Sequence, residues 1–367
     1  MTQGPLVRFR DLSIPDDERR ELLEAIDQLM RRGTFILGAD VEAFEQEFAR
    51  QCGRSECVGV SNGTGGLYLA LRALGVGPGD EVVTTAMSWV ATANAVIALG
   101  ATPVFADVAD DFNIDPASVE AAITPLTKAI LPVHYYGLMA RMDALMPMAA
   151  RHGLKVVEDA SQAFGSNLEG RPAGSFGDAA AFSLNRMKPL AALGEAGAVV
   201  LDNPEAAEHI RSMRYLGTIN RETCVDPSLN FKIDTIQAVV LLSRMKRAER
   251  VVAHRNHLAR VYCEGLDGVV TVPHPPTDGT SAYFDYTIVC EDRDRLEEFL
   301  VAEGIEVKVR HRLLLTQQPG YRDVPAVEVP NALRLVSGIL SLPIHEAMTD
   351  DQAHLVIAAI RRFYGAS

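Results

Sequence analysis

The sequence places a lysine, Lys188, between two apolar segments with strand-like composition, AAAFSL and GAVVLD. The surrounding stretch, AFSLNRMKPLAALGEAG, also brings Ser183 and Asn185 close to this lysine along the chain. A long cationic side chain at such a point is either a solvated loop residue or a reactive amine. Lys188 alone does not decide between these interpretations, so the other polar groups that follow strand-like segments have to be considered with it.

Three further stretches place polar or aromatic groups where a strand-like segment gives way to a helical one. In SNGTGG (61–66), glycines let backbone N–H groups approach an anion, and the following helix N-terminus attracts negative charge. AMSW (86–89) ends with the one tryptophan of the chain, Trp89, which can stack on a planar ligand. VVEDASQAFGS (156–166) carries Glu158 and Asp159 at the tip of an apolar strand, where a carboxylate needs a cation. Taken singly, each stretch also fits an ordinary structural role as a helix cap or a core aromatic residue.

The four stretches point to one ligand when they are combined. Ligands of an open parallel sheet bind beyond the carboxyl ends of its strands, so all four stretches are expected at one edge of the sheet. A lysine amine, an aspartate, an aromatic ring and an anion-binding turn are the groups that pyridoxal 5′-phosphate requires. The amine forms an imine (Schiff base) with its aldehyde, and the carboxylate keeps its ring nitrogen protonated. We therefore expect pyridoxal 5′-phosphate as the cofactor.

The segments between these motifs predict an α/β fold. Helices are expected at 15–33 and 39–53, and from residue 56 apolar strands alternate with helices, which is typical of a mostly parallel sheet between helical layers. A long helical run at 233–266 precedes patterns that fit a smaller α/β domain of ~100 residues. We expect the N-terminal helices and a large cofactor-binding domain over 1–240, and a linking helix with a small C-terminal domain over 241–367. The strands expected in the two parts are ECVGV, EVVTTAM, TPVFADV, AILPVHYY and LKVVEDA, then VVTVP, YFDYTIVC and IEVKVRH.

The composition limits the kind of partner. With 48% hydrophobic and 23% charged residues and a net charge of −13, the chain has an ordinary globular composition and is unsuited to nucleic acid or an anionic membrane surface. The charge-free segment 82–106 contains polar residues and a Gly-Ala-Thr-Pro break, so it fits buried strands and a helix better than a membrane span. Five scattered cysteines without a CxxC pair, and an N-terminus without an apolar run, lead us to expect a cytoplasmic protein with reduced thiols.

Further motifs extend the set over most of the chain. They are GTFILGADVEAFEQEFA, VSNGTGGLYLAL, AMSWVATANAV, PVFADV, PVHYYGLMARMD, EDASQAFGS, GRPAGSFGDAAAFSL, GEAG and LNFKIDTIQAVVLLSRMK. In this combination the chain resembles the DegT/StrS family of sugar aminotransferases, which depend on pyridoxal phosphate and have the fold-type I architecture of the aspartate aminotransferase superfamily. The resemblance implies a large domain with a mostly parallel sheet and a smaller C-terminal α/β domain. It also implies transfer of an amino group from glutamate or glutamine to a keto sugar or keto-cyclitol in amino-sugar biosynthesis.

The resemblance implies roles for five residues around the cofactor ring. Lys188 matches the lysine that forms the imine and moves protons. Asp159 matches the partner of the ring nitrogen, and Gln162 matches a hydrogen-bond donor to the ring hydroxyl. Trp89 matches the residue that stacks on the ring, with Ser161 against the opposite face.

The cofactor phosphate is implied to lie at the helix that begins in SNGTGG. Gly63, Thr64 and Gly65 match its binding turn, and Ser183 matches a hydroxyl donor. Asn230 matches an asparagine that family members contribute to the phosphate of the neighbouring subunit. The resemblance therefore implies an obligatory homodimer with a composite active site.

The substrate residues are less well defined by the sequence. His134, Tyr135 and Tyr136 end a strand at the same edge of the predicted sheet. Arg310 and His311 stand in a loop of the small domain where many family members have a His-Tyr pair. We expect these five residues near a substrate that is a nucleotide-linked 3-keto or 4-keto sugar, a keto-cyclitol, or a sugar without a nucleotide.

Other functions fit the same fold. A sugar dehydratase has a histidine in the position of the lysine, and a lysine-retaining relative could eliminate or decarboxylate instead of transferring an amine. A regulator or scaffold could bind the cofactor without turnover. Lys188 argues against the dehydratase, and Lys188, Asp159 and Gln162 together argue against the regulator. His254 and His257 have the spacing of a helical metal pair but lack a third ligand nearby, so we expect no metal site.

Overall fold

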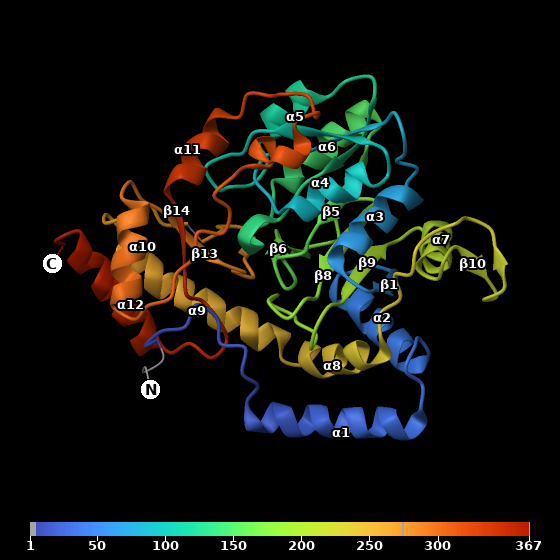
Figure 1. The fold of residues 1–367 in the computed structure, drawn as a ribbon, viewed down its shortest axis with the longest axis horizontal. Coiled ribbons are helices and arrows are strands. Elements are labelled where there is room, and N and C mark those ends of the chain that lie inside the picture. The colour runs from blue at the N-terminus through green and yellow to red at the C-terminus, as the bar shows by residue number, and fades with distance from the viewer. Residues whose placement is uncertain (1–4, 274, 367) are drawn as a thin grey trace.

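A seven-stranded mixed sheet organises the first two thirds of the chain in the computed structural model, which describes residues 5–273 and 275–366 (Figure 1). Residues 1–4 of the N-terminal stretch considered above lie outside that description. Strand β9 is antiparallel to both neighbours, and the other neighbouring strands are parallel, which confirms the mostly parallel sheet. The strands, in their order across the sheet, are β1 (Glu56–Val60), β9 (Gly197–Leu201), β8 (Ala179–Ser183), β5 (Lys155–Asp159), β4 (Thr127–Leu131), β2 (Glu81–Thr85) and β3 (Thr102–Ala106).

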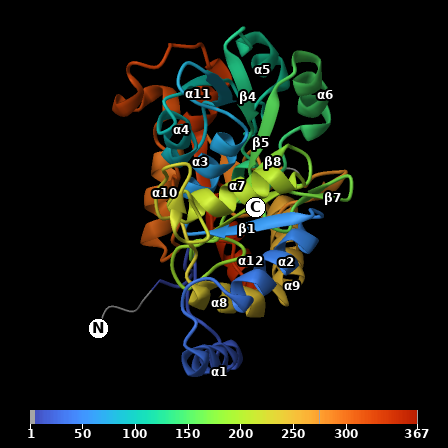
Figure 2. The same cartoon turned by 90° about the vertical axis from the view of Figure 1, so that its right-hand side faces the viewer.

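Helices cover both faces of this sheet because successive strand residues point to opposite sides. In β5, Val156 packs into one apolar cluster with Phe44 and Phe48, whereas Val157 packs into another with Leu67 and Leu69. The first cluster lies under α2 (Ala39–Gln51), α6 (Met142–His152) and α8 (Thr235–Met245). The second lies under α3 (Gly63–Ala73), α4 (Val90–Ile97) and α7 (Pro204–Arg214). Helix α5 (Pro116–Ala122) packs near β3, and α1 (Asp16–Arg32) lies outside α8 (Figure 2).

The long helical run predicted at 233–266 is two helices. Helix α8 ends at Met245, and α9 (Ala248–Leu266) begins after a break at 246–247 that no glycine or proline announces. The packing partners explain the break, since α8 packs on α1 and α2 whereas α9 packs on α12 (Asp350–Phe363). The predicted division at 240/241 falls inside α8. We propose that the two parts divide at the break instead.

The C-terminal part contains a small antiparallel sheet beside α9 (Figure 1). Its strands are β13 (Tyr286–Val289) and β14 (Ile339–Leu342), with α10 (Arg293–Ala302) and α11 (Pro330–Gly338) packed against them. The predicted strands VVTVP and IEVKVRH form only isolated bridges, at Thr271, Ile305 and Lys308. The remaining short elements are β6 (Asn167–Leu168), β7 (Arg171–Pro172), β10 (Thr218–Ile219), β11 (Thr223–Cys224), β12 (Gly279–Thr280) and the 3₁₀ turns Tyr135–Gly137, Leu315–Gln317 and Pro319–Tyr321.

The strand order brings the polar stretches together. The segments after β1, β8, β5 and β2 leave the sheet at the same edge, because these four strands run in the same direction. Among the described residues, no helix is long and apolar enough to cross a membrane.

Glu158 holds the loop after β7 against the core of the sheet. Its fully buried carboxylate accepts hydrogen bonds from the N–H groups of Gly174, Phe176 and Gly177 at 2.8–2.9 Å and pairs with His134 at 2.9 Å. This explains why the carboxylate at 158 is structural rather than part of the cavity described next.

We expect Glu158→Gln to destabilise the fold by several kcal/mol, because one carboxylate oxygen is replaced by an NH₂ group that faces donors. Each buried donor left without an acceptor costs ~1–3 kcal/mol. The measurement is the thermal unfolding midpoint, with the exposed Glu169→Gln as the matched control. Equal midpoints for the two variants would contradict this assignment.

Candidate active site

A cavity of about 680 Å³ lies at this edge of the sheet. Its lining comes from the segments that follow β1, β2, β5 and β8 and from the C-terminal loop around residue 310. The cavity brings together ten of the residues singled out from the sequence: Gly63, Thr64, Trp89, Asp159, Ser161, Gln162, Ser183, Lys188, Arg310 and His311.

Lys188 projects into this cavity from the loop between β8 and β9. The loop is shaped by Asn185, whose side chain accepts the N–H of Met187 and whose carbonyl accepts the N–H of Lys188, at 2.8 and 2.9 Å. The Nζ atom lies 4.4 Å from the ring centroid of Phe284. Burial lowers the pKa of Lys188 to about 8; Asp159 opposes this shift, and the charge of Arg310 adds to it. The amine is therefore much more often neutral at neutral pH than an ordinary lysine.

Asp159 is 4% exposed and is held by a chain of hydroxyl groups. Its Oδ2 accepts a hydrogen bond from Thr92 Oγ1 at 2.8 Å, and its Oδ1 accepts the N–H of Ser161 at 3.2 Å. Ser88 Oγ lies 2.8 Å from Thr92 Oγ1. Because Thr92 gives its single proton to a carboxylate that can only accept, Ser88 must donate to Thr92. The chain of donors fixes the position and orientation of the carboxylate.

Gln162 presents a hydrogen-bond donor to the cavity. Its Oε1 accepts the N–H of Tyr136 at 2.8 Å, and the residue is 7% exposed. Since the oxygen is engaged with a backbone donor, the NH₂ group is the part left to donate into the cavity.

The start of α3 forms the anion-binding end. Asn62 caps the helix by accepting the N–H of Gly65 at 2.8 Å. The N–H groups of Gly63 and Thr64 lie in the first turn, where the helix itself offers them no acceptor. A Cβ atom at Gly63 would lie 2.6 Å from the Cβ of Ser183, so only glycine lets the helix approach β8 this closely. Gly65 does not line the cavity; a Cβ there would lie 2.6 Å from the ring of Phe231.

Trp89 is 57% exposed at the cavity wall, which excludes the alternative of a core tryptophan. Its ring is stacked on that of His311 with centroids 5.6 Å apart. Burial, with the charge of Arg310, lowers the pKa of His311 to about 4, so this imidazole is neutral at neutral pH.

A buried ion-pair network supports the C-terminal wall. The Asp285 carboxylate binds Arg310 at 2.5 and 2.9 Å and Arg10 at 2.6 Å. Arg10 also donates to the carbonyl oxygen of Phe284, the residue whose ring lies against Lys188. The N-terminal segment thus helps to position the lysine.

Besides Gly65, four of the candidate residues do not line this cavity. His134 is fully buried and pairs with Glu158. Its side chain therefore faces the carboxylate that holds the loop after β7, and not the cavity. The side chains of Tyr135 and Tyr136 line a neighbouring cavity. Asn230 is exposed after the β10–β11 hairpin and does not line the cavity of its own chain.

Sequence reasoning missed Thr92, Phe284, Asp285 and Arg10. Thr92 stands three positions after Trp89 at the start of a helix, and this spacing places both on one face. No pattern marks the other three, since they meet only through contacts between distant segments.

Comparison with known proteins identifies the class. The family model for the DegT/DnrJ/EryC1/StrS aminotransferases matches residues 16–361, and the chain belongs to this family. It is 39% identical to a dTDP-3-amino-3,4,6-trideoxy-α-D-glucose transaminase of Streptomyces venezuelae, over 98% of this chain and 97% of the relative.

Solved structures agree with this assignment. The S. venezuelae protein DesV, determined in complex with a ketimine intermediate, superposes with a TM-score of 0.96 at 38% identity over the full length of both chains. NtdA of Bacillus subtilis, with bound cofactor PMP, gives a TM-score of 0.92 at 30% identity over 100% of this chain and 86% of NtdA. The predicted fold class and aminotransferase activity are therefore confirmed.

The cofactor is pyridoxal 5′-phosphate, as in this family, and the cavity fits it. The structure supplies a lysine amine with a lowered pKa, a fixed carboxylate, an amide donor and free N–H groups at a helix N-terminus. The same cavity contains an exposed indole face.

We expect Lys188 in cofactor-free protein to react with formaldehyde and cyanoborohydride in proportion to its neutral fraction, with a midpoint near pH 8. Mass spectrometry of the peptide measures the rate. A synthetic peptide of the same stretch should titrate near ~10.4, the ordinary value for lysine. Because the Arg310 charge lowers the pKa, Arg310→Gln should move the midpoint upward, and a downward shift would contradict this electrostatic account.

Proposed function

We propose that this chain transfers an amino group from glutamate or glutamine to a nucleotide-linked keto sugar in amino-sugar biosynthesis. The observation that carries the proposal is the presence of Lys188 and Asp159 in one cavity, electrostatically coupled and with the lysine pKa lowered to about 8. Similarity to the S. venezuelae transaminase over almost the whole chain supports the sugar as acceptor.

The proposed cofactor contacts follow from the geometry of the cavity. When bound, pyridoxal phosphate supplies a reactive carbonyl group and a ring that accepts electrons. Asp159 would hold a proton at the ring nitrogen, and Gln162 would donate to the ring hydroxyl. Trp89 and Ser161 would lie against opposite faces of the ring. The N–H groups of Gly63 and Thr64, with the Ser183 hydroxyl, would hold the phosphate, while Gly65 allows the helix to pack.

Lys188 is proposed as the proton carrier. Its neutral amine takes a proton from the α-carbon of the donor amino acid and delivers it within the same cavity. A base with a pKa near the working pH is best suited to both steps, and such transfer contributes ~10²–10⁴-fold to the rate.

Lys308 is the proposed contact for an anionic group of the substrate. It lines the cavity, and no acidic side chain in the described part of the chain lies within ion-pair distance of it. Arg310 is already occupied by Asp285, so its role is to shape the wall beside His311. The sugar would lie between this wall and Trp89.

We also propose a cytoplasmic homodimer that completes the site. The segments around residues 35–36 and 216–229, near Asn230, carry exposed apolar side chains: Phe35, Ile36, Leu216, Ile219, Val225 and Leu229. Their segments are connected, because Ile36 forms a backbone β-bridge with Asp234 and Tyr215 forms one with Asn230. Apolar patches of this kind on a soluble protein mark interfaces. A second copy seated here would bring its Asn230 to the phosphate end.

The function is tested with Lys188→Ala and the amino donor. Wild-type holoenzyme mixed with glutamate should lose its visible absorption band as the cofactor is aminated, and borohydride reduction without donor should attach the cofactor mass to Lys188. The variant should show neither and lose at least about 10³-fold in turnover. An active Lys188→Ala enzyme, or wild type that never converts with glutamate or glutamine, would contradict the assignment; the second result would favour a cofactor-binding regulator.

The composite dimer is tested by mixing subunits. Asn230→Asp places a negative charge at the proposed phosphate contact, so both this variant and Lys188→Ala should be nearly inactive alone. A heterodimer isolated through two different affinity tags has one site with both native residues and should recover about half of the wild-type activity. An inactive heterodimer would show that Asn230 serves its own chain, and an active Asn230→Asp homodimer would show that it serves no site.

A further inference from the structure

A second cavity, of about 460 Å³, lies behind the wall of the candidate active site. One side is formed by the loops after β3 and β4, and the other by segments within 271–289 and by α11. The two linings share no described residue. They are nevertheless in contact, because the Tyr135 ring lies 6.1 Å from that of His311 and Asp285 binds Arg310.

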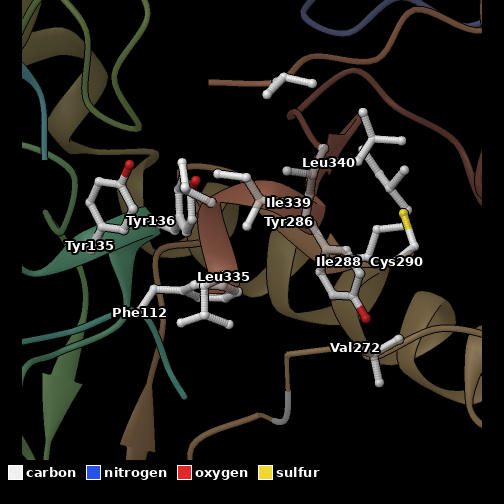
Figure 3. Packing of buried hydrophobic residues seen from close by; sticks show 14 of the residues in the cluster. Phe112, Tyr135, Tyr136, Val272, Tyr286, Ile288, Cys290, Leu335, Ile339 and Leu340 are labelled. Carbon is white, nitrogen blue, oxygen red and sulfur yellow. The ribbon is translucent and has the colours of Figure 1, made fainter. Parts of the chain in front are cut away.

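Aromatic rings form much of the wall. Figure 3 shows Phe112, Tyr135 and Tyr136 beside Leu335 of α11, and all four line the cavity. The rings of Phe112 and Tyr136 meet edge to face, with centroids 5.5 Å apart. Electron-rich ring faces of this kind attract organic cations.

Asp111 gives the cavity a carboxylate without a counter-ion. Its Oδ1 accepts the N–H of Asn113 at 3.0 Å, and in the described ranges no lysine, arginine or histidine lies within ion-pair distance of it. Its neighbour Asp110 is different, since Arg334 binds it at 2.5 Å. Burial raises the pKa of Asp111, and the hydrogen bonds from Asn113 and the more distant charge of Arg141 only partly oppose this shift.

The buried hydroxyl of Tyr283 has no partner in hydrogen-bonding geometry among the described residues, whereas those of Tyr135 and Tyr136 interact with one another and that of Tyr136 also with Thr287. All three tyrosines line the cavity. A buried hydroxyl without a partner is uncommon, so a ligand or ordered water is expected to meet Tyr283.

The charges of the described lining argue against an anionic occupant. Among the described residues, Arg334 is the one basic side chain in it, and Arg334 already pairs with Asp110. Asp285 is neutralised by Arg10 and Arg310, so among the described carboxylates of the lining only Asp111 has no ion-pair partner.

We propose that this cavity binds a mostly apolar organic ammonium ion, with its charge at Asp111 and its body against Phe112, Tyr136 and Leu335. Such a ligand touches both sides of the cavity, so it holds the C-terminal part in a fixed position relative to the sheet. Through Tyr135 and Asp285 it also acts on the wall that carries His311 and Arg310. The site is independent of the proposed substrate.

Benzyltrimethylammonium tests the proposal, because a quaternary amine cannot form an imine with the cofactor. Isothermal titration of the holoenzyme should show saturable binding. Asp111→Asn should weaken it by at least about tenfold, and Phe112→Leu by several-fold, since each removes one of the two attractions. The matched control Glu169→Gln removes an exposed charge elsewhere and should leave the affinity unchanged.

Transaminase activity without the probe provides the folding check, since Asp111 does not line the active-site cavity. It should be equal in wild type and Asp111→Asn. The proposal is overturned by the absence of saturable binding to the wild type, or by equal affinities of the wild type and a folded Asp111→Asn. Failure of amine transfer in all variants with intact probe binding would sink the proposed function but leave this site standing.

Discussion

The chemistry of this protein depends on the partial burial of one amine at the edge of the sheet. Lys188 sits where the sheet edge, the Phe284 ring and the C-terminal wall enclose it, and this burial is the largest influence on its pKa. Asp159 opposes the shift, and Arg310 and Arg10 reinforce it. The pKa of Lys188 is therefore set by opposing influences. A lysine fully paired with a carboxylate would stay protonated, whereas a buried lysine without any carboxylate would lose the charge that attracts anionic substrates. A value near neutrality lets the same group take up a proton and release it.

That balance is maintained by residues outside the cavity. Asp285 is completely buried, yet two arginines satisfy it, one from the N-terminal segment and one from the C-terminal part. Val7 and Phe9 extend the attachment by binding to residues 305 and 306. The N-terminal segment 7–10 and the segments around residues 285 and 305–310 therefore build one wall. Displacement of this buried carboxylate would be costly, because it would break hydrogen bonds to two charged groups in a desolvated place.

The cofactor end of the active-site cavity and its C-terminal wall are built differently. The hydroxyl chain from Ser88 to Asp159, the capped start of α3 and the Gln162 amide form a rigid set on strand ends and helix starts. We propose that the C-terminal wall, with Lys308 and His311, contacts the sugar. Since Tyr135 and Asp285 connect this wall to the second cavity, we propose that a ligand there acts on the position of the wall.

The sequence by itself determined the alternation of strands and helices, the direction of the sheet and the convergence of Lys188, Asp159, Trp89 and the SNGTGG turn, because these follow from local patterns and from where parallel strands end. The tertiary structure decided what distant segments do to one another. It separated α8 from α9 through their different packing partners, engaged His134 with Glu158 and moved the side chains of Tyr135 and Tyr136 into another cavity. It also assembled Arg10, Asp285 and Arg310; the Arg10–Asp285 contact spans 275 positions, and neither it nor the Asp285–Arg310 contact leaves a periodic signal in the chain.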